Sequence, residues 1–299
     1  MNPGLGQIKA LSETCTTFND LCLPRLVLHL DFNRIKDEEE YPVVHRAYNE
    51  VNISGAEVDE YSKKIKETLR SSRYTATKLF IGSYEPDVTQ KCVITQRVLM
   101  SVLKALPNVT ELTMENIKAK KPFTSFTAIK DNEYPRLRNL TDLHLYNCSD
   151  SAISALKHAS NLEKLRVCIE NEVPSSRKYS ALVAQQRGLE TLRINCYHDF
   201  HLKAGTFPSL KTFEGPDEQF FLNTDIFEIA PNVENIKLIF PGLIRTEDSF
   251  LMQNESVYLK TFETQAYVDL DIFSIRDIRN NYPSLESFKS ANLEWRKLT

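Results

Sequence analysis

Residues 139–148 read NLTDLHLYNC, and this stretch decides the fold of the chain. Leu143 and Leu145 alternate with three other side chains, so an extended backbone places both leucines on one face of a sheet. Leu140 and Cys148 flank the alternation as further core residues. The stretch therefore predicts a half-buried strand, whose apolar face must be covered by other parts of the chain.

The frame of this stretch recurs along the chain: an apolar residue, two variable residues, a second apolar residue, one variable residue and a third position that is usually apolar. Clear copies begin at Leu140, Leu162, Leu189, Leu210, Val233, Leu259 and Leu285, with intervals of 22, 27, 21, 23, 26 and 26 residues. Fainter copies occur in residues 108–114, 76–82 and 23–30. One such unit cannot bury its own apolar face, so the repetition predicts strands that stack in sequence order.

Several segments between the predicted strands have the three- and four-residue apolar spacing of amphipathic helices. We predict helices over 54–69, 95–106, 149–159 and 269–279. The intervals near 31–54 and 115–135 lack strong periodicity and are predicted to be loop insertions. Strands that alternate with helices indicate the α/β class.

The repeated frame resembles the leucine-rich repeat, LxxLxLxxN/C, whose period is about 20 to 29 residues. This resemblance implies a leucine-rich-repeat solenoid over residues 25–299, with a curved parallel sheet on the concave side and helices and loops on the convex side. The third position is read as polar in three copies, at Glu214, Thr264 and Ser290, which indicates that these repeats are irregular.

A different segment, LSETCTTFNDLCLPRL (11–26), precedes the first predicted strand. Its apolar residues have helical spacing and end at a proline, so periodicity alone predicts an N-terminal cap of the solenoid. The order of its residues is similar to the final helix of an F-box, which implies that residues 1–24 carry the C-terminal part of that module. The adaptor-docking residues implied by this resemblance are Leu11, Cys15, Phe18, Leu21 and Pro24.

Together, the two segments resemble the F-box/leucine-rich-repeat proteins, in the irregular form common in fungi. In that family, the F-box holds the Skp adaptor of a cullin ubiquitin ligase, and the solenoid captures the protein to be ubiquitinated. We therefore expect a non-catalytic protein-binding module that recognises substrates for such a ligase and is monomeric outside the complex. The alternative is a free-standing leucine-rich-repeat scaffold without ligase association.

The variable positions of the predicted strands are candidates for contact with a protein substrate on the concave face. Lys164, Arg166, Arg193 and His144 are expected to cluster beside Tyr146, a combination that suits an acidic protein segment. Nucleic-acid binding through the same basic residues is a further alternative. The candidate protein-binding residues are Asp142, His144, Tyr146, Lys164, Arg166, Arg193, Asn195, Lys237 and Glu263.

Composition and motifs argue against several other functions. With 37 basic and 40 acidic residues, the net charge is -3, so no global positive field favours nucleic acid or an anionic membrane. No apolar run reaches the roughly 20 residues of a membrane span, and no secretion signal opens the chain, so we expect a cytoplasmic or nuclear protein. No phosphate-binding or hydrolase motif occurs, and Cys196, His198, Asp199 and His201 lack a second ligand cluster. We predict no catalytic residue, cofactor or metal.

Overall fold

In the computed structural model, contacts within the chain divide it into two compact units, Met1–Ala159 (unit 1) and Ser160–Thr299 (unit 2). The described residues are 27–31, 48–55, 58, 63, 65, 69, 76–82, 92–119, 137–149, 152, 159–169, 181, 183–196, 205–215, 226–239, 243–244, 255–265, 267–268, 275–291 and 293–296. The F-box-like segment 1–24 lies outside these residues. Each unit is described by itself.

Among the described residues of unit 1, parallel strands form a sheet in the order β1–β2–β3–β5–β7. These strands are β1 (Val27–Asp31), β2 (Glu50–Ser54), β3 (Lys78–Gly82), β5 (Glu111–Glu115) and β7 (Asp142–Tyr146). A separate parallel pair joins β4 (Cys92–Ile94) to β6 (Ile117–Ala119). Helix α4 (Gln96–Ala105) follows β4, and the short 3-10 helix η5 (Leu137–Asn139) precedes β7.

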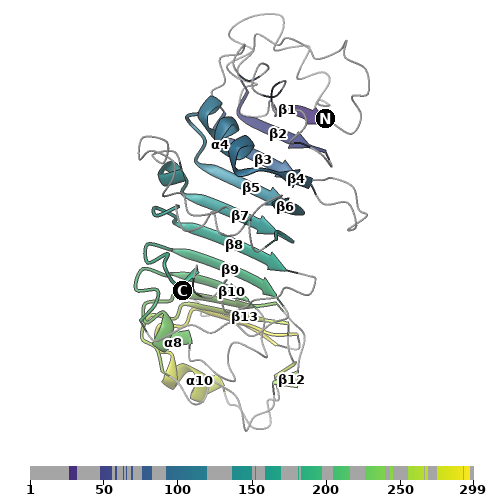
Figure 1. The fold of residues 1–299 in the computed structure, drawn as a ribbon. Coiled ribbons are helices and arrows are strands. Elements are labelled where there is room, and N and C mark those ends of the chain that lie inside the picture. The colour runs from purple at the N-terminus through teal and green to yellow at the C-terminus, as the bar shows by residue number, and fades with distance from the viewer. Residues whose placement is uncertain are drawn as a thin grey trace, which may run out of the picture. The chain divides into compact units, whose positions relative to one another are not determined.

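Unit 2 repeats this arrangement, and Figure 1 shows β8, β9 and β10 side by side and running in one direction. The sheet strands are β8 (Lys164–Ile169), β9 (Thr191–Cys196), β10 (Thr212–Gly215), β11 (Asn235–Leu238), β13 (Thr261–Thr264) and β15 (Ser287–Lys289). Strand β16 (Glu294–Arg296) pairs with β15 in the antiparallel direction. Elsewhere in the unit are the pair β12 (Leu243–Ile244) and β14 (Tyr267–Val268), and helices α8 (Ile226–Ile229) and α10 (Ile275–Asn281).

The alternation predicted from the repeated frame is confirmed in these strands. Leu143 and Leu145 are buried, and the three residues that alternate with them in β7 are half-buried. Register pairing sets each inward side chain beside the inward side chain of the next strand. In unit 2, such a buried row consists of Leu165, Leu192, Phe213, Ile236, Phe262 and Phe288. Full burial of each such side chain contributes about 1.5–3 kcal/mol to folding, so these rows form the core.

A recurring backbone pattern also holds successive strands in register. The carbonyl of the residue before a strand accepts two hydrogen bonds, from the residue before the next strand and from the first residue of that strand. Glu234 O, for example, accepts from the N–H groups of Lys260 at 2.7 Å and Thr261 at 3.1 Å. The same pair of bonds leads into β3, β5 and β7 in unit 1 and into β9, β10, β11 and β15 in unit 2. Because only backbone groups take part, the side chains at these positions remain variable.

Two irregular third frame positions of unit 2 have local physical reasons. In the copy that begins at Leu210, the inward third position is Gly215, and not Glu214 as predicted, because Glu214 faces outward. A Cβ on Gly215 would lie 2.5 Å from Cζ of Phe213, so the buried aromatic ring already occupies that space. Ser290 is buried, its N–H donates to Leu293 O at 2.7 Å, and its hydroxyl accepts from Leu293 N–H at 3.1 Å. Ser290 thus stabilises the turn that reverses the chain into β16.

Helix α4 confirms the helix predicted over 95–106. The Thr95 hydroxyl accepts a hydrogen bond from Val98 N–H at 3.4 Å and caps the first turn. The helix ends at the residue before Leu106, and Pro107 follows. Its apolar face is buried, as the spacing predicted, and includes Val98, Leu99, Val102 and Leu103.

The other three predicted helices are described only in part. Of residues 54–69, Ile65 and Leu69 are helical and buried. Of residues 149–159, Ala152 is helical. Helix α10 overlaps the helix predicted over 269–279 but extends to Asn281, with Ile278 buried. The remaining residues of these three segments are not all among those described.

The predicted loop near 31–54 requires a correction, because its last five residues form β2. Val51 and Ile53 are fully buried in this strand, and Tyr48 fills the first inward position of the frame. An aromatic ring in place of the usual leucine concealed this copy of the repeat. In the predicted loop near 115–135, Ile117–Ala119 forms β6, and 120–135 lie outside the described residues. The fold class is α/β with mostly parallel strands and few helices, which is compatible with a solenoid.

Candidate functional site

The side chains available to a partner lie on what we call the open face of each sheet. This face carries the strand positions that alternate with the buried core positions. Three rows of side chains cross it: the pre-strand row is the residue before each strand, the first row is the first residue of each strand, and the middle row is the third. Register pairing keeps each row aligned across neighbouring strands.

In unit 1, charge is concentrated in the first row. The pre-strand row consists of Asn49, Thr77, Thr110 and Thr141. The first row consists of Glu50, Lys78, Glu111 and Asp142. The middle row consists of Asn52, Phe80, Thr113 and His144. The first row of β2, β3, β5 and β7 therefore holds three carboxylates and one ammonium. This part of the open face is acidic.

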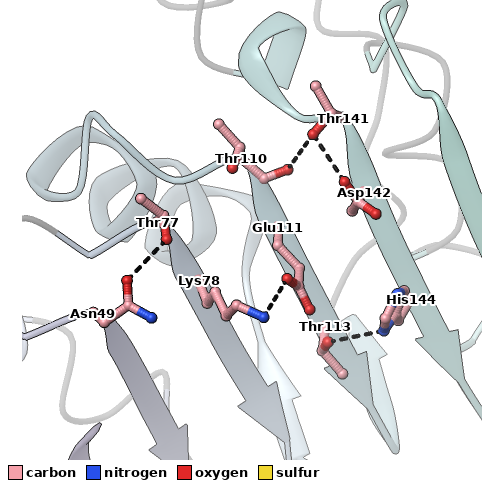
Figure 2. A network of polar contacts seen from close by, with 9 residues as sticks. All are labelled: Asn49, Thr77, Lys78, Thr110, Glu111, Thr113, Thr141, Asp142 and His144. Atoms are coloured by element: carbon pink, nitrogen blue, oxygen red, sulfur yellow. Dashed lines mark hydrogen bonds and ion pairs between the residues drawn. The ribbon is translucent and has the colours of Figure 1, made fainter. Parts of the chain in front are cut away.

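Figure 2 shows the principal ion pair of that row, in which Lys78 Nζ lies 2.8 Å from Glu111 Oε2. The hydrogen bond with Glu111 raises the pKa of Lys78, and the carboxylates of Glu50 and Asp142 act in the same direction, against the opposing effect of partial burial. The ammonium is therefore stabilised in its charged form. The acidic first row keeps its only lysine engaged within the row.

The three predicted site residues of unit 1 occupy half-buried positions of β7. Thr141 Oγ1 donates to Asp142 Oδ2 at 2.9 Å, and His144 Nδ1 lies 3.4 Å from Thr113 Oγ1 (Figure 2). Tyr146 follows at the end of the strand. Asp142, His144 and Tyr146 thus share one strand and one face, as the alternation predicted.

In unit 2, the charge distribution over the rows is different. The pre-strand row consists of Glu163, Glu190, Lys211, Glu234, Lys260 and Glu286. The first row consists of Lys164, Thr191, Thr212, Asn235, Thr261 and Ser287. The middle row consists of Arg166, Arg193, Glu214, Lys237, Glu263 and Lys289. Here the middle and pre-strand rows are charged, and the first row is mostly uncharged. The six predicted site residues of unit 2 all lie on this face, with Asn195 beyond the middle row in β9.

Three residues of the predicted basic patch lie on neighbouring strands of unit 2. Arg166 pairs in register with Arg193, and Lys164 lies two residues before Arg166 on the same strand. Arg193 Nε lies 3.4 Å from Glu214 Oε2, so part of the positive charge is neutralised from the neighbouring strand. His144, the fourth residue of the predicted patch, is described with unit 1. The patch in unit 2 therefore consists of Lys164, Arg166 and the ion-paired Arg193.

A hollow of about 330 Å³ lies on the open face of unit 2, over β10, β11, β13, β15 and β16. Glu263 Oε1 lies 3.7 Å from Lys237 Nζ and 3.9 Å from Lys289 Nζ, so two ammonium groups share one carboxylate. Glu294 and Arg296 of β16 also line the hollow and pair with each other at 2.7 Å. Lys237 and Glu263 were among the predicted site residues, whereas Lys289, Glu294 and Arg296 were not.

First-row side chains supply hydroxyl and amide groups to the same hollow. Thr261 Oγ1 donates to Asn235 Oδ1 at 2.7 Å, and Asn235 Nδ2 donates to Thr212 Oγ1 at 3.5 Å. Ser287 continues this row on the next strand. The period of the frame indicated that these positions face outward, but their hydrogen bonding depends on neighbouring strands and was not predicted.

Other predicted features fall partly or wholly outside the described residues. The adaptor-docking residues lie there, as do His198, Asp199 and His201. Within the described ranges, no group of three or more His, Cys, Asp and Glu residues could hold a metal ion. In the same part of the chain, no helix is both long enough and apolar enough to cross a lipid bilayer.

Comparison with models of protein families and with curated protein sequences gives no match for this chain. The resemblance to F-box/leucine-rich-repeat proteins therefore rests on the repeated frame and on residues 11–26. The function has to be argued from the open face and its hollow.

Proposed function

We propose that the chain is a non-catalytic protein-binding module of the leucine-rich-repeat type, with the partner bound on the open face. The observation that carries this proposal is the alternation of buried and outward-facing side chains along β5, β7, β10 and β11. Alternate positions are buried in register with one another, and the intervening positions present variable polar side chains. Neighbouring strands lie about 4.8 Å apart, so a partner segment that crosses them meets one new side chain per strand.

The charge distribution favours a protein over a nucleic acid as the partner. In unit 1 the first row is acidic, and in unit 2 the middle row alternates in sign from Arg193 to Lys289. A phosphate backbone would be repelled by every carboxylate along these rows, whereas a protein segment can carry complementary charges of both signs. Mixed charge of this kind adds specificity and speeds association more than it adds affinity.

The ligase role is the second part of the proposal and rests on the sequence of residues 11–24. We propose that this segment docks a Skp-type adaptor, so that the open face presents its protein partner to a cullin ubiquitin ligase in the cytoplasm or nucleus. If the segment only caps the repeats, the chain acts as a free-standing scaffold instead.

Binding of purified Skp-type adaptor to the full chain separates these two roles. We expect adaptor binding by the full chain and its loss in a variant with Leu11→Asp and Phe18→Asp, because these apolar residues share one predicted helical face. Thr16→Asp is the matched control, since it lies off that face and should leave binding unchanged. Absence of adaptor binding by the unaltered chain would remove the ligase role and leave the scaffold.

Photo-crosslinking tests the binding module itself. A photoreactive amino acid at Tyr146 or Asn195, on the open face of unit 1 or unit 2, should crosslink a discrete protein partner in extracts of the cells that produce the chain. The control position is Lys104, which is exposed on helix α4. Equal crosslinking from Lys104 and from the two strand positions would contradict binding on the open face.

A further inference from the structure

We infer that the hollow of unit 2 receives a carboxylate of an extended protein segment between Lys237 and Lys289. This inference rests on the proposed protein-binding function and specifies the chemistry of the partner. It assigns a binding role to Lys289, Thr212 and Ser287, which lie beside the residues that sequence analysis selected. The observations behind it are the loose ion pairs, the unused hydrogen-bond donors and the charge of the hollow.

The two ammonium groups are close to a carboxylate but do not form hydrogen bonds with it. Their distances from Glu263 Oε1, 3.7 and 3.9 Å, exceed the roughly 2.7–3.2 Å of a charged hydrogen bond. Among the described residues, neither Lys237 nor Lys289 has any other polar contact. Each ammonium carries three N–H donors, so both retain donors for an incoming acceptor.

The first-row side chains contribute donors as well. Within the hydrogen-bond chain from Thr261 to Asn235 to Thr212, the Thr212 hydroxyl is an acceptor, and its own O–H has no acceptor among the described residues. The Ser287 hydroxyl likewise has no hydrogen bond in the described part of the chain. The hydroxyl groups of Thr212 and Ser287 therefore retain O–H donors beside the two ammonium groups, and a ligand with acceptor oxygens can use both kinds of donor.

The charge of the hollow also favours an anionic ligand. Its described lining contains three cationic side chains, Lys237, Lys289 and Arg296, and two carboxylates, Glu263 and Glu294. The hollow therefore carries one net positive charge, in a chain whose net charge is -3. A bound carboxylate would neutralise that charge, whereas a cationic ligand would add to it.

The size and position of the hollow indicate an extended segment. A volume of about 330 Å³ is near the lower end for a small-ligand pocket, which is enough for one or two side chains. The hollow is lined by first-row and middle-row side chains of four strands, and β16 borders it through Glu294 and Arg296. A segment that crosses these strands can set one carboxylate between the lysines and place its backbone carbonyls over the hydroxyl groups.

Binding of short labelled peptides to the full chain, followed by fluorescence anisotropy at low ionic strength, tests the inference. The main probe is an N-acetylated, C-amidated peptide of alternating serine and glutamate. An N-acetylated serine peptide with a free C-terminal carboxylate tests the other source of the same group, and its C-amidated form is the blank. We expect either carboxylate peptide to bind more tightly than the blank, and the tighter of the two identifies the source.

The variants give effects of opposite sign. Lys237→Gln and Lys289→Gln should each weaken peptide binding about three- to fivefold, and both together about tenfold or more. Glu263→Gln should strengthen binding, because it removes the carboxylate that competes for the two ammonium groups. The matched control is Lys260→Gln, which removes a lysine already held by Glu234 at 2.6 Å outside the hollow.

Three results would overturn the inference: no binding of either carboxylate peptide, equal weakening by Lys260→Gln, or tighter binding of a single-stranded oligothymidylate of the same length. The crosslinks from Tyr146 and Asn195 separate this failure from that of the proposed function. Crosslinks that persist in the Lys237→Gln, Lys289→Gln double variant, without any peptide binding, would retain the binding module and reject the carboxylate site.

Discussion

The two units share a scaffold but distribute charge differently over their open faces. In unit 1, the pre-strand row is uncharged and the first row carries Lys78 between Glu50 and Glu111. In unit 2, the pre-strand row carries Glu234 and Lys260. The first row, which follows it along each strand, consists mostly of hydroxyl and amide side chains. The same backbone hydrogen bonds lead into the strands in both units.

This difference shows which positions the fold constrains and which it leaves to function. Most inward positions are apolar in both units, because each packs against its neighbour in register. The outward rows can exchange charged and uncharged residues, because the recurring bonds that lead into each strand are made by backbone groups. The outward charges can therefore differ between the units without any change in the scaffold.

The largest effect is expected from breaking what the units share. Leu143→Ala in unit 1 and Leu192→Ala in unit 2 should each lower the free energy of unfolding by about 2–5 kcal/mol, since both leucines are buried in the inward rows. Thr191→Ala, at a half-buried outward position beside Leu192, is the control and should cost about 0.5 kcal/mol or less. Urea unfolding measures all three. A cost below about 1 kcal/mol at either leucine would contradict a packed inward row.

An intermediate effect is expected where the backbone of neighbouring strands approaches closely. A Cβ on Gly82 in unit 1 would lie 2.8 Å from the carbonyl oxygen of Glu115, so Gly82→Ala should destabilise by about 1–3 kcal/mol. A Cβ on Gly188 in unit 2 would lie 3.7 Å from Leu162 O, an ordinary contact. Gly188→Ala is therefore the matched control, and its expected change in thermal stability is close to zero. Equal losses at both glycines would show that general strain, and not the close approach at Gly82, sets the cost.

The smallest effects concern the ion pairs that distinguish the two faces. The pKa of Lys78 is raised by its hydrogen bond with Glu111, so this stabilisation is present at neutral pH and is lost as the pH rises through the folded pKa, above the ordinary 10.5. Glu111→Gln should remove that alkaline dependence at a cost of less than about 1 kcal/mol, because the pair is partly exposed. Unfolding measured between neutral and alkaline pH provides the test, and an unchanged alkaline slope would contradict it.

In unit 2, the ion pair between Lys260 and Glu234 is expected to affect stability at acidic pH. The hydrogen bond from Lys260 lowers the pKa of Glu234 below its ordinary 4.5, so the stabilisation is present at neutral pH and is lost as the pH falls through the folded pKa. Glu234→Gln should reduce the acid sensitivity of unfolding, and Glu286→Gln, two positions further along the pre-strand row, is the control. A change of equal size in the control would assign the acid sensitivity to the row as a whole.

Much of the strand pattern could be predicted from the sequence, because the frame depends only on spacing along the chain. Leu143, Leu145 and the helix before Pro107 were identified in this way. Strand β2 was missed, since Tyr48 replaces the leucine that usually opens the frame. The reversal into β16 was not predicted either, because Ser290 is recognisable as a turn residue only through its bonds to Leu293.

The candidate site was predictable only as a set of outward positions. Spacing placed Lys237 and Glu263 on the open face but did not indicate that Lys289 would share the same carboxylate. It grouped Arg193 with Arg166, which lies beside it in register, but did not indicate the ion pair of Arg193 with Glu214. In both cases, the missing information was which side chains lie opposite each other on neighbouring strands.

The sequence by itself therefore determined the repeat period and which side chains face inward, because burial of alternate positions follows from local spacing and the hydrophobic effect. Only the tertiary structure decided how the outward charges are paired and where the hollow forms. Those contacts join residues more than 20 positions apart, such as Lys237 and Glu263, and they depend on strand register and on the reach of flexible side chains. The local pattern encodes neither of these.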